Sequence, residues 1–178
     1  MSIDALRDLL PAYAKDLSLN LSSLAGETTL TDQQKWGTFL ASAYGVGQPE
    51  VIAAIETAAS SLSPEAATAA KAAAAIMGMN NVYYRALHLI HNPEYRTLPA
   101  KLRMNVIANP GAPKADFELW SLAVSAINGC GLCLDSHEAE LRKHQVSTTA
   151  IQTALRIGAV VNAVCRVIAA ENAVRQAA

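Results

Sequence analysis

Charged side chains are scarce in this chain. They make up 16% of its 178 residues, and the formal net charge is −1. The lysine and arginine residues are scattered along the sequence rather than gathered in one segment. A protein that binds nucleic acid or an acidic membrane face needs a basic patch. We therefore expect neither of these partners.

The sequence also lacks an uncharged apolar run that approaches the roughly 18 residues of a membrane span. Arg156 and Arg166 interrupt the best candidate. The N-terminal residues include Asp4 and Asp8 and contain no apolar segment of the signal-peptide kind. These features favour a cytoplasmic protein, a setting in which thiols are kept reduced.

Cysteine is rare as well, with three residues in all, and an odd number does not suit a secreted disulfide framework. Two of them, Cys130 and Cys133, are three residues apart. A bond between them contributes roughly 2 kcal/mol through chain entropy, against nearly 5 kcal/mol for a 100-residue loop. Because it would connect no distant elements, we interpret the pair as a reactive switch rather than a structural crosslink.

Alternating patterns typical of β-strands are absent, whereas helix signals recur from end to end. We predict an all-α protein. Helix-start signals occur at Ser2, at Thr31 with Gln34, at Pro49, at Ser63 with Pro64, and at Ser147. With the apolar periodicity they predict a first helix that stops at Pro11, followed by helices over about 12–23, 31–45, 49–60, 66–91, 114–127, 130–144 and 148–175.

Proline interrupts the pattern between residues 92 and 113, which form the one long irregular connection. Trp36 and Trp120 lie 84 residues apart, and Ser63 and Ser147 open long apolar helices at the same spacing. We interpret the chain as a single domain over 1–178. It contains two pseudo-repeats, about 1–92 and 114–178, joined by the proline-rich connection, and the paired thiols are in the second.

The most informative motif is Cys130-Gly131-Leu132-Cys133, followed four residues later by His137. On one helix these three side chains fall within an arc of about 60°, because each residue advances by about 100°. Cα atoms on consecutive turns are about 5 Å apart, inside the disulfide range. The thiolate is the reactive form. A helix N-terminus favours it at Cys130, whereas the i+4 spacing to His137 favours Cys133, so the attacking sulfur stays open.

Other interpretations of the cysteines are half of a zinc site or two ordinary core residues. A structural zinc site needs four ligands, and the remaining candidates, Asp135, Glu138, His144 and Cys165, include no second Cys-x-x-Cys. We favour the redox pair for this reason. Cys165 itself lies in an apolar helical pattern typical of a core cysteine.

Glu118 lies twelve residues before Cys130, between apolar neighbours. A partly buried carboxylate has a raised pKa and can shuttle protons near neutral pH. On pattern alone, a solvated helical glutamate is the alternative.

The spacing Glu118-x11-Cys130-x2-Cys133-x3-His137 resembles the active-site pattern of the alkyl hydroperoxide reductase D proteins (AhpD), in the carboxymuconolactone-decarboxylase-like superfamily. The likeness extends over nearly the whole chain, through blocks at 13–16, 19–23, 75–82, 103–110 and 117–130. One departure is Gly131-Leu132, where the family members compared carry Ser-His. Any role of that intervening histidine is missing in this chain.

The resemblance implies an internally duplicated helical fold, a homotrimer and a thiol-dependent alkyl hydroperoxide reductase that also reduces oxidised peroxiredoxin AhpC. Electrons would come from dihydrolipoamide on a lipoylated dihydrolipoamide acyltransferase and from dihydrolipoamide dehydrogenase, with no bound flavin, haem or metal. It assigns Cys133 as the peroxidatic thiol, which forms a sulfenic acid, and Cys130 as the proton donor and resolving thiol. Glu118 and His137 become the proton relay. The alternative is a disulfide-shuttle adaptor without significant peroxidase activity.

Overall fold

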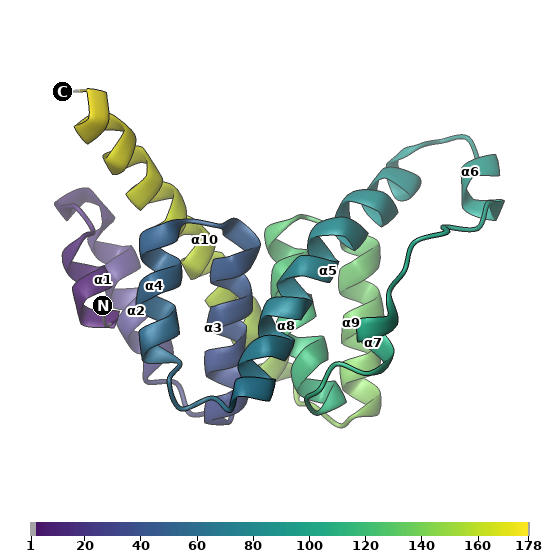
Figure 1. Ribbon diagram of the computed structural model, residues 1–178, viewed down its shortest axis with the longest axis horizontal. Helices are drawn as coiled ribbons and strands as arrows, with labels where there is room; N and C mark the ends of the chain where they lie inside the picture. The colour runs from purple at the N-terminus through teal and green to yellow at the C-terminus, as the bar shows by residue number, and fades with distance from the viewer. Residues whose placement is uncertain (1–2, 178) are drawn as a thin grey trace.

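The computed structural model describes residues 3–177, and these form α-helices, one short 3-10 helix and no β-strand. The prediction of an all-α chain is confirmed (Figure 1). The predicted cap at Ser2 lies outside the described residues. In order, the elements are α1 (Ile3–Asp8), η1 (Ala12–Ala14), α2 (Lys15–Ala25), α3 (Asp32–Val46), α4 (Pro49–Ala58), α5 (Pro64–Leu89), α6 (Glu94–Thr97), α7 (Asn105–Ala108), α8 (Lys114–Ile127), α9 (Gly131–Lys143) and α10 (Thr148–Ala177).

Several predicted helix starts are formed as expected. Thr31 and Gln34 make a reciprocal capping box at the start of α3. Ser63 accepts a hydrogen bond from the backbone N–H of Ala66, and Ser147 accepts one from Ala150, each at 3.1 Å. Such caps satisfy backbone donors that a helix N-terminus leaves free.

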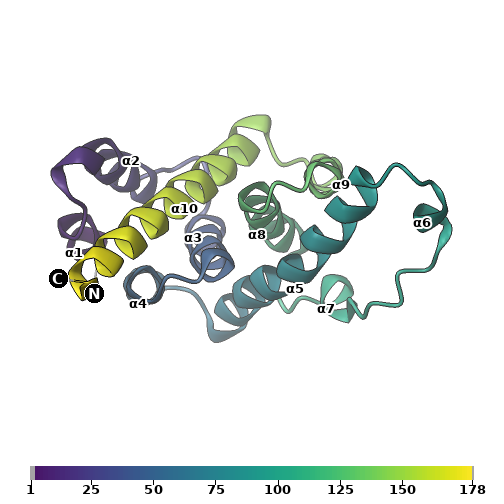
Figure 2. The same ribbon diagram turned by 90° about the horizontal axis from the view of Figure 1, so that it is seen from above.

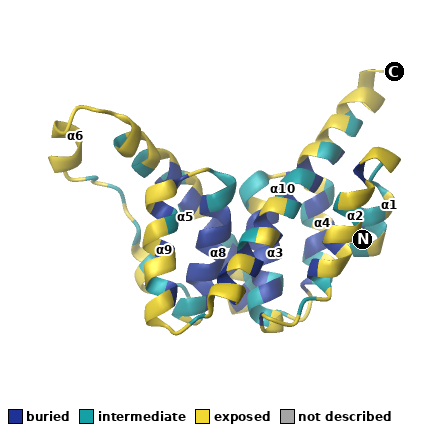
Figure 3. Cartoon of the chain, turned by 180° about the vertical axis from the view of Figure 1, so that it is seen from behind, coloured by how far each residue is buried: buried dark blue, intermediate teal, exposed yellow. Residues whose placement is uncertain are grey.

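The centre of the molecule is built on contacts among α3, α5, α8 and α10. Phe39, Phe117 and Trp120 are fully buried there, and Figure 3 shows buried residues concentrated in these central helices. Gly37 lets α3 approach α8, because a Cβ atom at this position would lie 2.3 Å from the Trp120 ring. The Trp120 indole N–H donates to the backbone carbonyl of Gln34 at 3.2 Å.

The connection between α5 and α8 extends away from the body of the molecule (Figures 1 and 2). It was predicted to be irregular and contains two single-turn helices, α6 and α7. Tyr95 and Leu98 are exposed on this connection, and so is Leu89 at the end of α5. The chain then returns through α7, which contacts α5, and so forms one side of the site described below.

By length and composition alone, α10 is apolar enough to cross a membrane, with one window of mean hydropathy 1.5. However, 44% of that window is buried inside the protein, and α10 packs against α2, α3 and α8 (Figure 2). Core helices of soluble proteins pass the same test, so one such helix is weak evidence for a membrane span.

Candidate active site

The two paired cysteines lie at the N-terminus of α9. The expectation that Cys130 belongs to the helix was wrong by one residue, because α9 begins at Gly131 and Cys130 is its N-cap. The Cys130 sulfur accepts a hydrogen bond from the backbone N–H of Cys133 at 3.3 Å. A disulfide joins the two residues, with their Cα atoms 5.3 Å apart. The predicted proximity of the sulfurs is confirmed.

The turn before the pair is tied to α5 by side-chain hydrogen bonds. Gly129 has φ +67°, a left-handed conformation that side chains disfavour. Arg85 donates to the Asn128 carbonyl at 2.5 Å, and the Asn128 amide donates to Oδ1 of Asn81 at 3.0 Å. These contacts fix the direction in which Cys130 enters the helix.

A cavity of about 660 Å³ opens beside the pair, a volume typical of a small-molecule site. Its walls come from α5, the α7 segment, α8 and α9. Cys133 lines this cavity, whereas Cys130 is fully buried and is not part of the lining. The geometry therefore distinguishes the two sulfurs: Cys133 is the one placed to meet a ligand.

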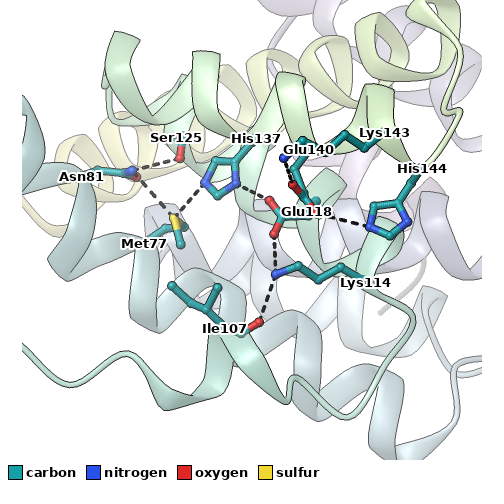
Figure 4. A network of polar contacts seen from close by, with 10 residues as sticks. All are labelled: Met77, Asn81, Ile107, Lys114, Glu118, Ser125, His137, Glu140, Lys143 and His144. Atoms are coloured by element: carbon teal, nitrogen blue, oxygen red, sulfur yellow. Dashed lines mark hydrogen bonds and ion pairs between the residues drawn. The ribbon is translucent and has the colours of Figure 1, made fainter.

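Glu118 and His137, which the sequence placed nineteen residues apart, meet at one wall of the cavity. The His137 Nδ1 and Glu118 Oε2 atoms are 2.5 Å apart, and both residues are buried. The second carboxylate oxygen of Glu118 lies 2.8 Å from the Lys114 ammonium group. Lys114 also donates to the Ile107 carbonyl at 3.0 Å (Figure 4). Glu118 is thus held from both sides, not solvated.

The expectation that the Glu118 pKa is raised was wrong. Burial is the largest single effect and does raise it, but hydrogen bonds from His137 and Lys114, with their charges, together lower the pKa below its ordinary 4.5. The apolar neighbours of Glu118 in the sequence indicated that this residue is buried, but they did not reveal its partners His137 and Lys114. An ionised Glu118 accepts a hydrogen bond from the Nδ1–H of His137, which leaves Nε2 as the nitrogen that exchanges protons with its surroundings.

On its other side, His137 contacts a methionine. Its Nε2 atom lies 3.3 Å from the Met77 sulfur, which the Asn81 amide also approaches at 3.8 Å. Asn81 donates to the Ser125 hydroxyl at 2.9 Å (Figure 4). Among residues 3–177, no hydrogen bond joins His137 to either sulfur in this disulfide form, although His137 and Cys133 line the same cavity.

Sequence reasoning missed four residues that support the site: Met77, Asn81, Arg85 and Lys114. A signal existed for Lys114, since it lies four residues before Glu118 and such pairs face each other on a helix. Met77 is buried. Its contact with His137 depends on how α5 packs against α9, which no local pattern reveals.

The chain is similar to known proteins over nearly its whole length. The carboxymuconolactone decarboxylase family model matches residues 93–176. The chain is 71% identical over 173 residues to the alkyl hydroperoxide reductase AhpD of Maricaulis maris, covering 97% of this chain and 100% of that protein. The chain belongs to the AhpD family. An AhpD of Hyphomonas neptunium is 66% identical, with 97% of each chain covered. One of Streptomyces avermitilis is 58% identical, covering 96% of this chain and 97% of that protein.

Within this AhpD fold, Leu132 occupies one of the two positions between the cysteines where the sequence departs from the expected Ser-His. Its side chain is 47% exposed and lines the cavity. The rim therefore carries an apolar group instead of a titratable one. Among the described lining residues, His137 is the one histidine.

The third cysteine is remote from the pair. Cys165 is buried in α10, as predicted, and its burial raises its thiol pKa to about 12. It lies beside the N-terminus of α4, where it lines a separate hollow with Gln48 and Pro49. Within the described part of the chain, no group of three or more His, Cys, Asp or Glu residues is placed to hold a metal ion.

Proposed function

We propose that this protein is an alkyl hydroperoxide reductase that uses Cys130 and Cys133 as its redox pair. One observation carries the proposal: a disulfide at a helix N-terminus presents Cys133 to a cavity that the His137–Glu118 pair also lines. The names of the curated relatives, alkyl hydroperoxide reductase AhpD, support the same activity. A low-pKa, accessible thiol next to a resolving cysteine is the arrangement that peroxide chemistry needs.

In the oxidative step, His137 removes the proton of the Cys133 thiol, and Glu118 stabilises the resulting imidazolium. The N-terminus of α9 favours negative charge on the sulfur. The thiolate attacks the terminal oxygen of the hydroperoxide, and the O–O bond breaks. The terminal OH remains on sulfur as sulfenic acid, while the alkoxide takes a proton from His137 and leaves as alcohol.

In the resolving step, the Cys130 sulfur attacks the sulfenic sulfur of Cys133. The S–O bond breaks, water leaves, and the disulfide forms. The 5.3 Å Cα separation lets this happen without backbone movement. A dithiol then reopens the bond by two exchange reactions and becomes a disulfide itself.

The reductant in this proposal is dihydrolipoamide, carried by a lipoylated acyltransferase and regenerated by dihydrolipoamide dehydrogenase. The cytoplasm supplies this thiol-reducing setting. The reduced pair would also pass two electrons to the disulfide of an AhpC-type peroxiredoxin. None of these steps needs a bound flavin, haem or metal. The proposed assembly is a homotrimer, and the exposed apolar side chains of Leu89, Tyr95 and Leu98 are candidates for burial between its subunits.

Rapid mixing of reduced protein with cumene hydroperoxide, in the absence of any peroxiredoxin, tests the proposal. We expect one equivalent of peroxide consumed and one Cys130–Cys133 disulfide formed, and continued turnover once dihydrolipoamide is added. If the pair exchanges with other disulfides but leaves the peroxide intact, the adaptor function replaces the peroxidase.

A further inference from the structure

Two adjacent asparagines on α5 differ in a way that points to the cavity. Asn81 is fully buried and saturated: its amide donates to Ser125, and its Oδ1 accepts from Asn128. Asn80 is also buried, with 5% of its surface exposed, but its Oδ1 has no hydrogen-bond partner. Asn80 lines the cavity that Cys133 and His137 line.

An unpaired buried carbonyl is costly, because its lost hydration is not replaced; the penalty is about 1–3 kcal/mol. More than about 90% of buried polar groups in folded proteins are therefore paired. In the described part of the chain, the other buried side-chain atoms without a partner are the hydroxyls of Ser42 and Ser121. Neither serine lines the cavity. Asn80 thus combines an unsatisfied acceptor with a place in the cavity lining, where a rotation of its amide group would let a ligand supply the missing donor.

The surroundings of Asn80 define what kind of ligand fits. Asn80 lies one helical turn after Met77, the residue whose sulfur contacts His137 Nε2. The cavity lining includes the apolar side chains of Tyr84, Met104, Ile107 and Leu132, together with charged side chains such as Lys114 and Lys143. A polar amide that lines the same cavity as Cys133, next to apolar lining residues, suits a ligand with a small polar head and an alkyl tail.

We propose that Asn80 is a substrate-binding residue that orients the hydroperoxide group toward Cys133; this inference rests on the proposed function. Once the amide group has rotated toward the cavity, the Asn80 Oδ1 atom accepts a hydrogen bond from the ROO–H group, so the terminal oxygen is held. The amide Nδ2–H donates to the inner oxygen. When the Cys133 thiolate attacks, the O–O electron pair moves to that inner oxygen, and the amide hydrogen bond stabilises the alkoxide until His137 protonates it.

The test compares Asn80→Leu with Ser42→Ala, a matched control that removes an unpaired buried polar atom outside the cavity lining. Stopped-flow oxidation of the reduced proteins by cumene hydroperoxide gives the rate of the first step. We expect Asn80→Leu to lower its second-order rate constant roughly 10- to 100-fold, while Ser42→Ala leaves it unchanged. Asn80→Ala, which adds no bulk, is expected to show the same loss.

Two further measurements separate substrate binding from other roles. Alkylation of Cys133 by iodoacetamide should keep its wild-type rate and pH profile in Asn80→Leu, because Asn80 does not activate the thiol. Reduction of the disulfide by dihydrolipoamide should also be unchanged. The melting temperature should not fall, because the variant removes an unsatisfied group.

Three results would overturn the assignment. The first is an unchanged peroxide rate in both Asn80 variants. The second is a slowed reductive step with a normal oxidative step, which would place the amide of the lipoyl reductant at Asn80. The third is an equal loss in peroxide reaction, alkylation and melting temperature, which would mark a structural role. If the wild-type protein itself fails to react with hydroperoxide, the proposed function fails, and the role of Asn80 fails with it.

Discussion

The N-termini of α4 and α9 are built on similar turns but are capped by different atoms. A left-handed glycine precedes each cap, Gly47 with φ +90° and Gly129 with φ +67°. At α4, the Gln48 side-chain oxygen accepts from the backbone N–H groups of Glu50 and Val51 at 2.7 and 3.2 Å. At α9, the Cys130 sulfur accepts from one N–H, at 3.3 Å.

Sulfur is a weak hydrogen-bond acceptor, so the Cys130 cap stabilises α9 less than the Gln48 cap stabilises α4. The same placement puts a thiol at the positive end of a helix, where the thiolate form is favoured. Cys165 lies near the turn that precedes α4, yet burial raises its thiol pKa to about 12. Proximity to such a turn therefore does not by itself favour the thiolate. Cys130 caps a helix, and Cys133 lines the same cavity as His137 and Glu118. Cys165 lines a different hollow and lies in the middle of α10.

The largest expected effect separates these thiols. Cys133→Ser should lower peroxide turnover by more than about a thousandfold, because no other thiol can take its role. Cys165→Ser should leave turnover within about twofold of wild type. Steady-state peroxide consumption with dihydrolipoamide measures both variants, and full activity in Cys133→Ser would remove the mechanism.

The next effect concerns Glu118, which lies 84 residues after Gln34, the same interval that separates Trp36 and Trp120. Glu118→Gln places in the second pseudo-repeat the same amide side chain that Gln34 provides in the first. We expect turnover at neutral pH to fall about 100-fold, since the neutral amide no longer stabilises protonated His137. The conservative control is Lys114→Arg, which keeps a cation beside Glu118 and should retain most activity.

Glu118→Gln should also change how stability depends on pH. The folded-state pKa of Glu118 is lowered, so its ionised form stabilises the fold above its unfolded-state pKa. That contribution is lost as pH falls through the folded-state value. Urea unfolding should show the variant about 2 kcal/mol less stable at pH 7, with the gap narrowing below about pH 4. A gap that widens on acidification would contradict the lowered pKa.

The smallest effect compares the caps directly, in proteins with reduced cysteines. Gln48→Ala should lower the free energy of unfolding by about 1 kcal/mol, because two backbone donors lose their acceptor. Cys130→Ser should raise it by roughly 0.5 kcal/mol, since a hydroxyl caps better than a thiol. Equal destabilisation by both changes would mean that the sulfur caps as well as the amide oxygen does.

The sequence predicted most of the fold because its helix signals are local. Thr31 with Gln34, Ser63 and Ser147 cap the helices they were expected to cap. The long connection contains the short helices α6 and α7, which such signals did not reveal. The two-repeat organisation stays a prediction; the order of α3–α5 and α8–α10, with the paired glycine turns, supports it.

The site was predictable only in part. The spacing of Cys130, Cys133 and His137 is local, so helix geometry predicted the close approach of the two cysteines and a His137 side chain on the same side as Cys133. The resemblance, not the spacing, brought Glu118 into the site, and the direction of its pKa shift depends on Lys114 and His137 arriving from two helices. Met77 and Asn80 line the cavity because α5 packs against α9. This tertiary contact cannot be predicted from local sequence patterns.

The central claim is that the Cys133 thiolate attacks the peroxide and that Cys130 resolves the resulting sulfenic acid. Mass spectrometry after substoichiometric cumene hydroperoxide and dimedone trapping tests this most directly. In wild type we predict a Cys130–Cys133 disulfide with Cys165 still reduced, and in Cys130→Ser a dimedone adduct on Cys133. An adduct on Cys165, or an unmodified Cys133 in that variant, would contradict the account.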